Sequence, residues 1–81
     1  MNLFVECMGA SIRWCGADSL KLDMPAGTTV SDVLHELSER YPELGSRRST
    51  IAVAIGDEII PLAREVRNGE TLALIPPVSG G

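Results

Sequence analysis

The last residues of the chain carry the most readily interpreted chemistry. The sequence ends Pro76-Pro77-Val78-Ser79-Gly80-Gly81. Because glycine has no Cβ and adopts almost any backbone conformation, a Gly-Gly end can lie extended in a channel that is too narrow for other residues. Proline cannot donate a hydrogen bond to a neighbouring strand, so Pro76 and Pro77 are expected to end the last strand and project the tail. The main-chain carboxylate of Gly81 is then the candidate reactive group, unless the end is merely frayed or truncated.

The composition fits one small soluble domain. The 81 residues allow a single hydrophobic core, and with 44% apolar and 22% charged residues the chain is expected to fold by itself. Seven basic against eleven acidic residues give a net charge of −4, which argues against nucleic-acid binding and suits a basic partner surface. The one basic cluster, Arg47-Arg48, is predicted to be a solvated loop.

Few side chains suit metal binding or catalysis. Cys7 and Cys15 are too few and wrongly spaced for a zinc site or a disulfide-stapled secreted domain, so they are predicted to be buried hydrophobes in a reducing cytoplasm. His35 is the only histidine and is expected on a helix surface. No catalytic motif, signal peptide or apolar run of about 18 residues for a membrane span is recognised, so an enzyme that acts alone is not expected.

The elements that must position the tail begin with two predicted strands. Leu3–Met8 is a short apolar segment typical of a buried strand, and Ser19–Met24 alternates with its apolar residues facing one way. Between them, Gly9–Ala17 is predicted to be a loop or hairpin turn in which Ile12 and Trp14 fold back as anchors.

A helix is predicted after the second strand. Thr29 is the expected N-cap because Asp32, three residues on, can complete a capping box. Glu36 and Arg40 are spaced to form an ion pair on the outer side, and Pro42 disfavours helical geometry at the residue before it. One apolar stripe can lie on a sheet: Val30, Val33, Leu34, Leu37 and Tyr41.

The next segment predicts a buried strand and a short edge strand. After a polar loop over residues 45–48, Ile51–Ile55 is a fully apolar run suited to a central strand that is covered on both faces. Gly56-Asp57-Glu58 then turns the chain into a short strand that begins at Ile59 and Ile60 and that Pro61 confines to an edge.

The last turn completes the predicted fold. Asn68-Gly69 is a strong turn signal that leads into a final strand, Thr71–Ile75. The order of elements is two strands, one helix and two or three strands. It predicts an α+β fold with a mixed four- to five-stranded sheet, one main helix packed across one face, and the other face open to a partner.

This order of elements, together with the end of the chain, resembles the MoaD/ThiS family of sulfur carriers, which includes the small subunit of molybdopterin synthase and has a ubiquitin-like β-grasp fold. The similarity covers nearly the whole chain, including Ala52–Ile60, the turn at residues 68–70 and the ending Leu74-Ile75-Pro76-Pro77-Val78-Ser79-Gly80-Gly81. The resemblance implies a single β-grasp domain over residues 1–81, in which residues 76–81 form a projecting flexible tail.

The resemblance also implies a function in molybdenum cofactor biosynthesis. In that family an adenylating enzyme related to ubiquitin-activating enzymes uses ATP to adenylate the terminal glycine, which then becomes a thiocarboxylate. The tail enters the large subunit of molybdopterin synthase, in an expected heterotetramer, and gives sulfur to precursor Z, a cyclic pyranopterin monophosphate. On this chain Gly81 would be the acyl carrier and Gly80 its flexible approach, with no bound cofactor. The partners would grip Pro76, Pro77, Val78 and Ser79.

The ending suits this chemistry. A carboxylate is a poor electrophile until it is joined to AMP as a mixed anhydride, and glycine leaves the acyl carbon unhindered. Bases and oxyanion donors must come from the partner enzymes, so the carrier is a cosubstrate within a two-chain enzyme.

Three further residues match an apolar docking patch of the family. Met8, Ile59 and Ile75 occupy the corresponding positions, and the alternative for each is core packing. Some positions depart from the family pattern: Leu74 and Ile75 replace paired phenylalanines, Gly56 replaces an asparagine, and Gly9–Trp14 only loosely follows the usual Arg-Glu form. These differences bear on the identity of the partner more than on the fold.

Two other functions remain open from the sequence. The chain could carry sulfur for thiamine, cysteine or a tungsten cofactor, or it could be a ubiquitin-like modifier whose Gly81 is joined to lysines of target proteins. The activating enzyme, the sulfur donor and the number of chains in the assembly are not determined by the sequence.

Overall fold

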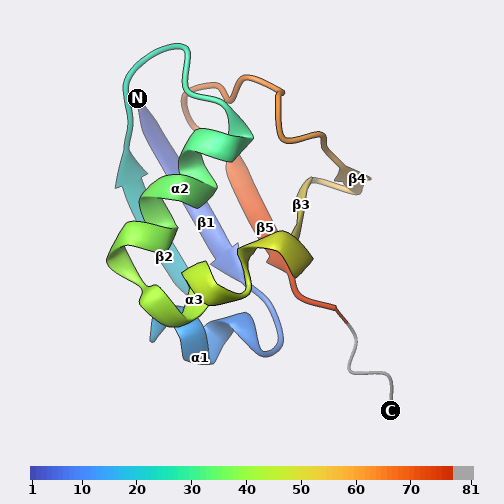
Figure 1. The fold of residues 1–81 in the computed structure, drawn as a ribbon. Helices are drawn as coiled ribbons and strands as arrows, with labels where there is room; N and C mark the ends of the chain where they lie inside the picture. Colours follow the sequence, from blue (N-terminus) through green and yellow to red (C-terminus); the bar gives the residue numbers. More distant parts are fainter. Residues whose placement is uncertain (78–81) are drawn as a thin grey trace.

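A five-stranded mixed sheet with one long helix across one face forms the body of the protein (Figure 1). The computed structural model describes residues 1–77. The strand order is β2-β1-β5-β3-β4, in which β1 and β5 pair in parallel and the other pairs are antiparallel. The predicted α+β architecture is therefore confirmed. The strands are β1 (Asn2–Cys7), β2 (Ser19–Asp23), β3 (Ala52–Ile55), β4 (Glu58–Ile59) and β5 (Thr71–Ile75).

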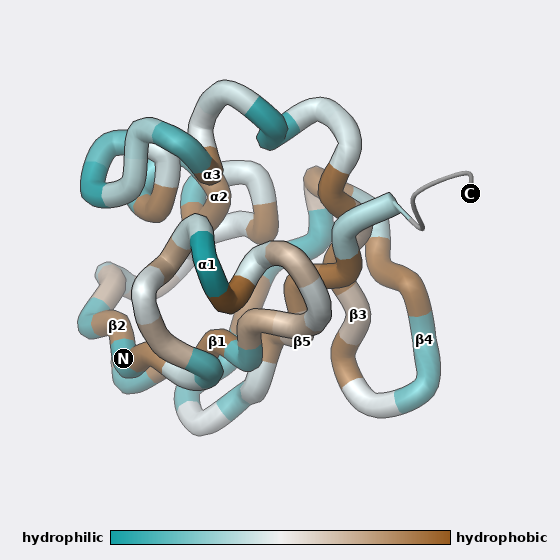
Figure 2. The backbone as a smooth tube through the Cα atoms, turned by 90° about the horizontal axis from the view of Figure 1, so that it is seen from below, coloured by the Kyte–Doolittle hydropathy of each residue, from teal (hydrophilic) through white to brown (hydrophobic). Residues whose placement is uncertain are grey.

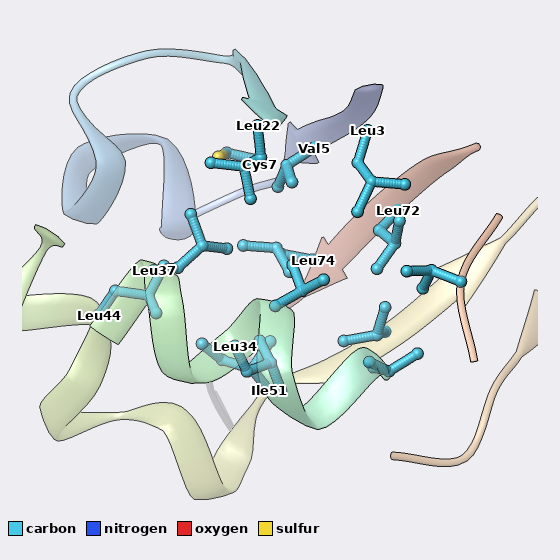
Figure 3. Close-up of a cluster of buried hydrophobic side chains, with 14 of the residues drawn as sticks. Leu3, Val5, Cys7, Leu22, Leu34, Leu37, Leu44, Ile51, Leu72 and Leu74 are labelled. Atoms are coloured by element: carbon cyan, nitrogen blue, oxygen red, sulfur yellow. The ribbon is translucent and has the colours of Figure 1, made fainter. Parts of the chain in front are cut away.

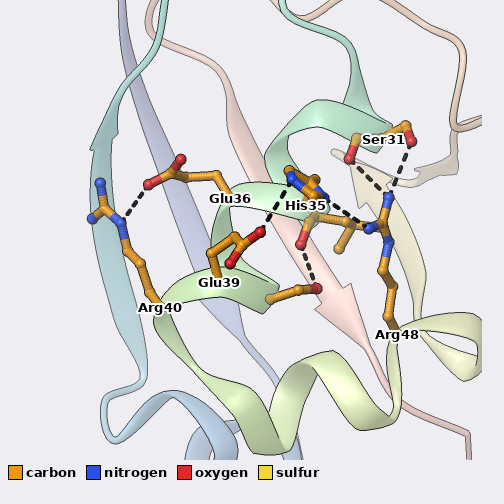
Figure 4. A network of polar contacts seen from close by, with 8 residues as sticks. Ser31, His35, Glu36, Glu39, Arg40 and Arg48 are labelled. Carbon is orange, nitrogen blue, oxygen red and sulfur yellow. Dashed lines mark hydrogen bonds and ion pairs between the residues drawn. The ribbon is translucent and has the colours of Figure 1, made fainter.

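The long helix, α2 (Val30–Arg40), begins and ends as predicted. The Asp32 N–H donates to Thr29 Oγ1 at 3.2 Å, and the Thr29 N–H donates to Asp32 Oδ2 at 2.9 Å, which makes a capping box. The hydrogen bond from the Thr29 N–H is the main cause that holds the pKa of the Asp32 carboxyl below its usual value. On the outer side of the helix, Arg40 Nε donates to Glu36 Oε2 at 2.7 Å (Figure 4).

The core lies between α2 and the inner face of the sheet (Figure 3). Alternate residues of each central strand point inward, and the rest point to the opposite face. Each fully buried aliphatic side chain stabilises the fold by about 1.5–3 kcal/mol. The fully buried residues from these elements include Leu3, Val5, Val30, Val33, Leu37, Leu72 and Leu74.

The segment predicted as a loop or hairpin turn contains a short helix, α1 (Ser11–Cys15), so that prediction was wrong. Ser11 Oγ donates to the Met8 carbonyl at 2.6 Å, and Gly16, with φ 73°, ends the helix by donating its N–H to the Ile12 carbonyl. The predicted anchors behave differently: Ile12 is 40% exposed, whereas Trp14 packs against the core. A helix of five residues is too short for the apolar period of a helix to appear in the sequence.

A second correction concerns the segment predicted as a polar loop. Here the chain forms α3 (Pro42–Ser46) and a 3₁₀ turn (Arg48–Thr50). Pro42 ends α2 as expected, but it also occupies the first turn of α3, where its missing N–H costs nothing. Leu44 is fully buried and fixes α3 to the core.

The order of the strands agrees with the prediction for the next segment. The apolar run Ile51–Ile55 was predicted to be a central strand, and β3 lies inside the sheet between β5 and β4, although β5 occupies the middle position. Val53 and Ala54 are buried on opposite faces, whereas Ala52 and Ile55 are only half-buried. The sequence pattern reported burial correctly, but burial does not specify which strands are neighbours.

The connection between β4 and β5 is held by Glu70. Its carboxylate accepts two hydrogen bonds from the Arg64 guanidinium, each at 3.0 Å, and a third from the Arg67 N–H at 2.6 Å. The hydrogen bonds from Arg64 are the main cause that lowers the pKa of the Glu70 carboxyl. Because Glu70 directly precedes β5, this ion pair fixes the start of the strand that leads to the tail.

This ion pair predicts how the stability depends on pH. Since the pKa of Glu70 is lower in the folded protein than in the unfolded chain, its stabilising contribution is complete above the unfolded pKa and is lost as the pH falls through the folded pKa. Glu70→Gln should flatten the dependence of the free energy of unfolding on pH in this acidic range, as measured by urea denaturation. Glu65→Gln, which removes an exposed carboxylate, is the control. If the free energy of unfolding of Glu70→Gln depended on acidic pH as strongly as that of the wild type, the Arg64–Glu70 ion pair would not be the source of this dependence.

Candidate functional site

The base of the tail is set by the two central strands. β5 ends at Ile75, as the prolines predicted, and Pro76 is half-buried while Pro77 is exposed. Gly9 has φ 53°, and a Cβ at this position would lie 3.5 Å from Pro76 Cγ, so the loop after β1 packs against the proline ring.

The end of the tail lies outside the described residues. The predictions for Val78, Ser79, Gly80 and Gly81 therefore stay predictions.

Three predicted docking residues share the outer face of the sheet, opposite α2. Cys7 is aligned with Leu74, so Met8 comes next to Ile75 on this face. Ile75 is paired with Ala52, and Ala54 is paired with both Ala73 and Ile59. Met8 is 47% exposed and Ile59 is 64% exposed, while Ile75 is half-buried. The alternative of core packing is therefore wrong for Met8 and Ile59.

Sequence reasoning missed a fourth apolar residue on this face. Phe4 is 41% exposed, and it alternates with the buried Leu3 and Val5 of β1. The apolar run in β1 hid this alternation, because all three residues are apolar. We call the apolar residues on this face the outer-face patch, which consists of Phe4, Met8, Ile59 and Ile75. The exposed carboxylate of Glu6 lies on the same face, because Glu6 is aligned with Ala73.

The single histidine lies away from this patch, on the exposed side of α2. His35 Nε2 is 3.4 Å from Glu39 Oε1, and its Nδ1 is 3.5 Å from Arg48 Nη1 (Figure 4). Arg48 also donates to the carbonyl and hydroxyl oxygens of Ser31, both at 3.2 Å. This network joins the 3₁₀ turn to α2 and confirms the predicted helix-surface position of His35. Within residues 1–77, no cluster of metal-binding side chains is found and no helix is long and apolar enough to cross a membrane.

Comparison with known proteins identifies the family. The model of the ThiS family matches residues 9–81, which is most of the chain. The chain belongs to the ThiS family. Its sequence is 38% identical to a molybdopterin synthase sulfur carrier subunit from Arabidopsis thaliana, over 82% of this chain and 69% of that protein.

Solved structures confirm the fold of this ThiS-family chain as a ubiquitin-like β-grasp. It is similar to SAMP1, the small archaeal modifier protein 1, from Haloferax volcanii, with a TM-score of 0.89 and 28% identity over 100% of both chains. It is also similar to a chain in the complex of subunits 1 and 2 of the molybdopterin-converting factor from Helicobacter pylori, with a TM-score of 0.71 and 20% identity over 100% of both chains. This second likeness shows the fold alone.

The two cysteines of the ThiS-family chain are buried in its core. Cys7 of β1 and Cys15 of α1 are both free thiols, with exposures of 3% and 5%. The pKa of Cys7 is raised to about 12, mainly by burial and to a smaller extent by a hydrogen bond with Cys15. Because the thiolate is the nucleophile, Cys7 is unsuited to sulfur relay at neutral pH.

A thiol-labelling experiment tests this conclusion. Iodoacetamide at neutral pH should leave Cys7 unmodified in the folded protein, because the thiol is both buried and protonated. Both cysteines should react once the chain is unfolded in urea, and mass spectrometry of the digested protein would locate the label. Rapid labelling of Cys7 under native conditions would contradict the conclusion that its thiol is unreactive in the folded protein.

Proposed function

We propose that this chain is the sulfur carrier subunit of a molybdopterin synthase, and that Gly81 carries the sulfur. The observation that supports this most strongly is the similarity, over most of the chain, to molybdopterin synthase sulfur carrier subunits, combined with an ending in Gly80-Gly81. The fold supports it further, because the central strand β5 leads directly into the prolines of the tail.

The proposed cycle has three steps. In an adenylating enzyme, a carboxylate oxygen of Gly81 attacks the α-phosphorus of ATP, forming the glycyl adenylate and releasing pyrophosphate. Hydrosulfide from a sulfur donor then attacks the acyl carbon, the bond to AMP breaks, and loss of a proton gives the thiocarboxylate. In the large subunit of molybdopterin synthase the sulfur passes to precursor Z, and water restores the carboxylate. The chain supplies only the acyl group in this cycle, so bases and oxyanion donors belong to its partners.

The body of the domain has a separate role in the proposal, which is to dock the partner. The outer-face patch offers exposed apolar side chains, and groups of exposed apolar residues rimmed by polar ones are typical of protein interfaces. The proposed occupant is a second subunit, by analogy with the complex of subunits 1 and 2 of the molybdopterin-converting factor from Helicobacter pylori, in which a chain of similar fold is found. Because Ile75 of the patch directly precedes Pro76, docking at the patch would aim the tail into the partner.

A second candidate function is protein modification. The similarity to SAMP1, whose full name describes a modifier, favours it. In that case Gly81 would form an isopeptide bond with lysine side chains, and digests of whole-cell protein would contain lysines that carry a Gly-Gly remnant. A sulfur carrier for another pathway would instead co-purify with a thiazole synthase or a cysteine-synthase-like enzyme.

The proposed chemistry is tested by the mass of the chain. Incubation with ATP, the cognate adenylating enzyme and a sulfur source should increase the intact mass by the difference between sulfur and oxygen, and the change should map to the C-terminal peptide. Deletion of Gly81 should abolish this increase and leave the melting temperature unchanged, because Gly81 follows the last strand in the sequence and has no side chain to bury in the core. An unchanged mass in the wild-type chain would contradict the proposal.

The docking role is tested with matched apolar residues. Ile59→Asp should weaken binding to the large synthase subunit by about tenfold or more, since a buried charge in the core of an interface is costly. Ile12→Asp is the control, because Ile12 is 40% exposed and lies on α1, outside the outer-face patch. Titration calorimetry gives the affinity, and thermal melts verify that both variants fold. Equal effects of the two substitutions would contradict docking at the patch.

A further inference from the structure

A cavity between two short helices brings cationic side chains and an aromatic ring together. The helices α1 and α3 pack against each other at one end of the sheet (Figure 1). The cavity between them has a volume of about 400 Å³. Viewed from this end, α1 presents a strongly hydrophilic segment (teal in Figure 2). The lining residues are Ala10, Arg13 and Trp14 on the α1 side and Glu43 and Arg47 on the α3 side.

The adjacent arginines at the end of α3 have different roles. The guanidinium of Arg48 turns toward α2 and donates to Ser31. The guanidinium carbon of Arg47 instead lies 5.1 Å from the ring centroid of Trp14, which is cation–π geometry. The pair predicted as a solvated loop therefore separates into one structural arginine and one that lines the cavity.

Within residues 1–77, the two arginines of this cavity form no ion pair. Arg40 and Arg64 each form an ion pair elsewhere, with Glu36 and Glu70. In the described part of the chain, no carboxylate lies within ion-pair distance of Arg13 or Arg47, although Glu43 lines the same cavity. Two unpaired guanidiniums thus converge on one side of a protein with a net charge of −4.

We propose that this cavity binds an acidic segment of a partner protein, whose Asp or Glu side chains pair with Arg13 and Arg47. Guanidinium groups present paired N–H donors that match a carboxylate, and opposite charge fixes the orientation of an approaching partner. Both arginines are exposed, so a single contact with either is worth little, and a segment with several carboxylates gains from engaging both.

The geometry favours a peptide over a small phosphate ligand. One face of the Trp14 ring is already covered by Arg47, which reduces the surface on which a nucleobase could stack. The cavity is lined by exposed charged side chains, and Glu43 opposes a compact dianion. An extended acidic segment can place its carboxylates beside the arginines and pass Glu43 at a distance.

The position of the cavity connects it to the tail. Ala10 lines the cavity, and the preceding Gly9 packs against Pro76. A partner that holds the tail at its base therefore passes within reach of the cavity. The proposal goes beyond the sulfur-carrier function and does not depend on it, because binding at the cavity does not involve Gly81.

The fluorescence of Trp14, the only tryptophan, provides a direct test. The full chain is titrated with a synthetic peptide of alternating Asp and Gly residues, and with a peptide of the same length in which Asn replaces Asp. The acidic peptide should produce a saturable change in emission that weakens at high ionic strength, and the neutral peptide should not. Arg13→Gln keeps the Trp14–Arg47 contact intact and should still weaken the binding.

The matched controls make the result decisive. The double variant R13Q/R47Q should bind the acidic peptide about tenfold more weakly than wild type. The variant K21Q/R67Q removes the same charge from two other exposed cations and should bind almost as tightly as wild type. Amide NMR shifts provide a second readout, and melting curves verify folding. Equal binding by the two double variants, no response to the acidic peptide, or preferential binding of inorganic phosphate or AMP would overturn the proposal.

Discussion

The parallel pairing of the first and last strands is the constraint on which the rest of this structure depends. β1 and β5 come from opposite ends of the sequence, yet they lie side by side in the middle of the sheet and bury their alternate residues under α2. Because parallel strands end at the same edge, the loop at Met8 and Gly9 lies against the base of the tail at Pro76. Met8 and Ile75 of the outer-face patch and the cavity between α1 and α3 therefore lie near the point where the chain leaves the sheet.

The two faces of the sheet differ in how far their apolar side chains are buried. Alternation along β1 and β5 sends leucine and valine side chains to the inner face, where they are removed from water. The same alternation leaves Phe4 and Met8 exposed, and Ile59 joins them from the edge strand. An apolar surface of this kind adds little to the stability of the isolated domain, but it can be buried by another protein.

Charge is distributed unevenly over the domain. The protein is acidic overall, with a net charge of −4, whereas Arg13 and Arg47 form a local exception beside Trp14. The β-grasp fold is shared by sulfur carriers and modifiers, and fold alone does not select among their partners. Local features such as the cavity and the outer-face patch are the places where such selectivity can reside.

The sequence alone determined the features that depend on neighbouring residues. The capping box at Thr29, the apolar stripe of α2, the last strand and its end before Pro76 were all predicted, because each rests on local hydrogen bonding, periodicity or the ring of proline. Only the tertiary structure decided that β5 is central, that α1 and α3 are helices, and that Arg47 meets Trp14. The physical reason is that the period of apolar residues shows only which face of its own helix or strand a residue occupies. Which helices and strands pack against that face depends on how the whole chain buries its apolar surface.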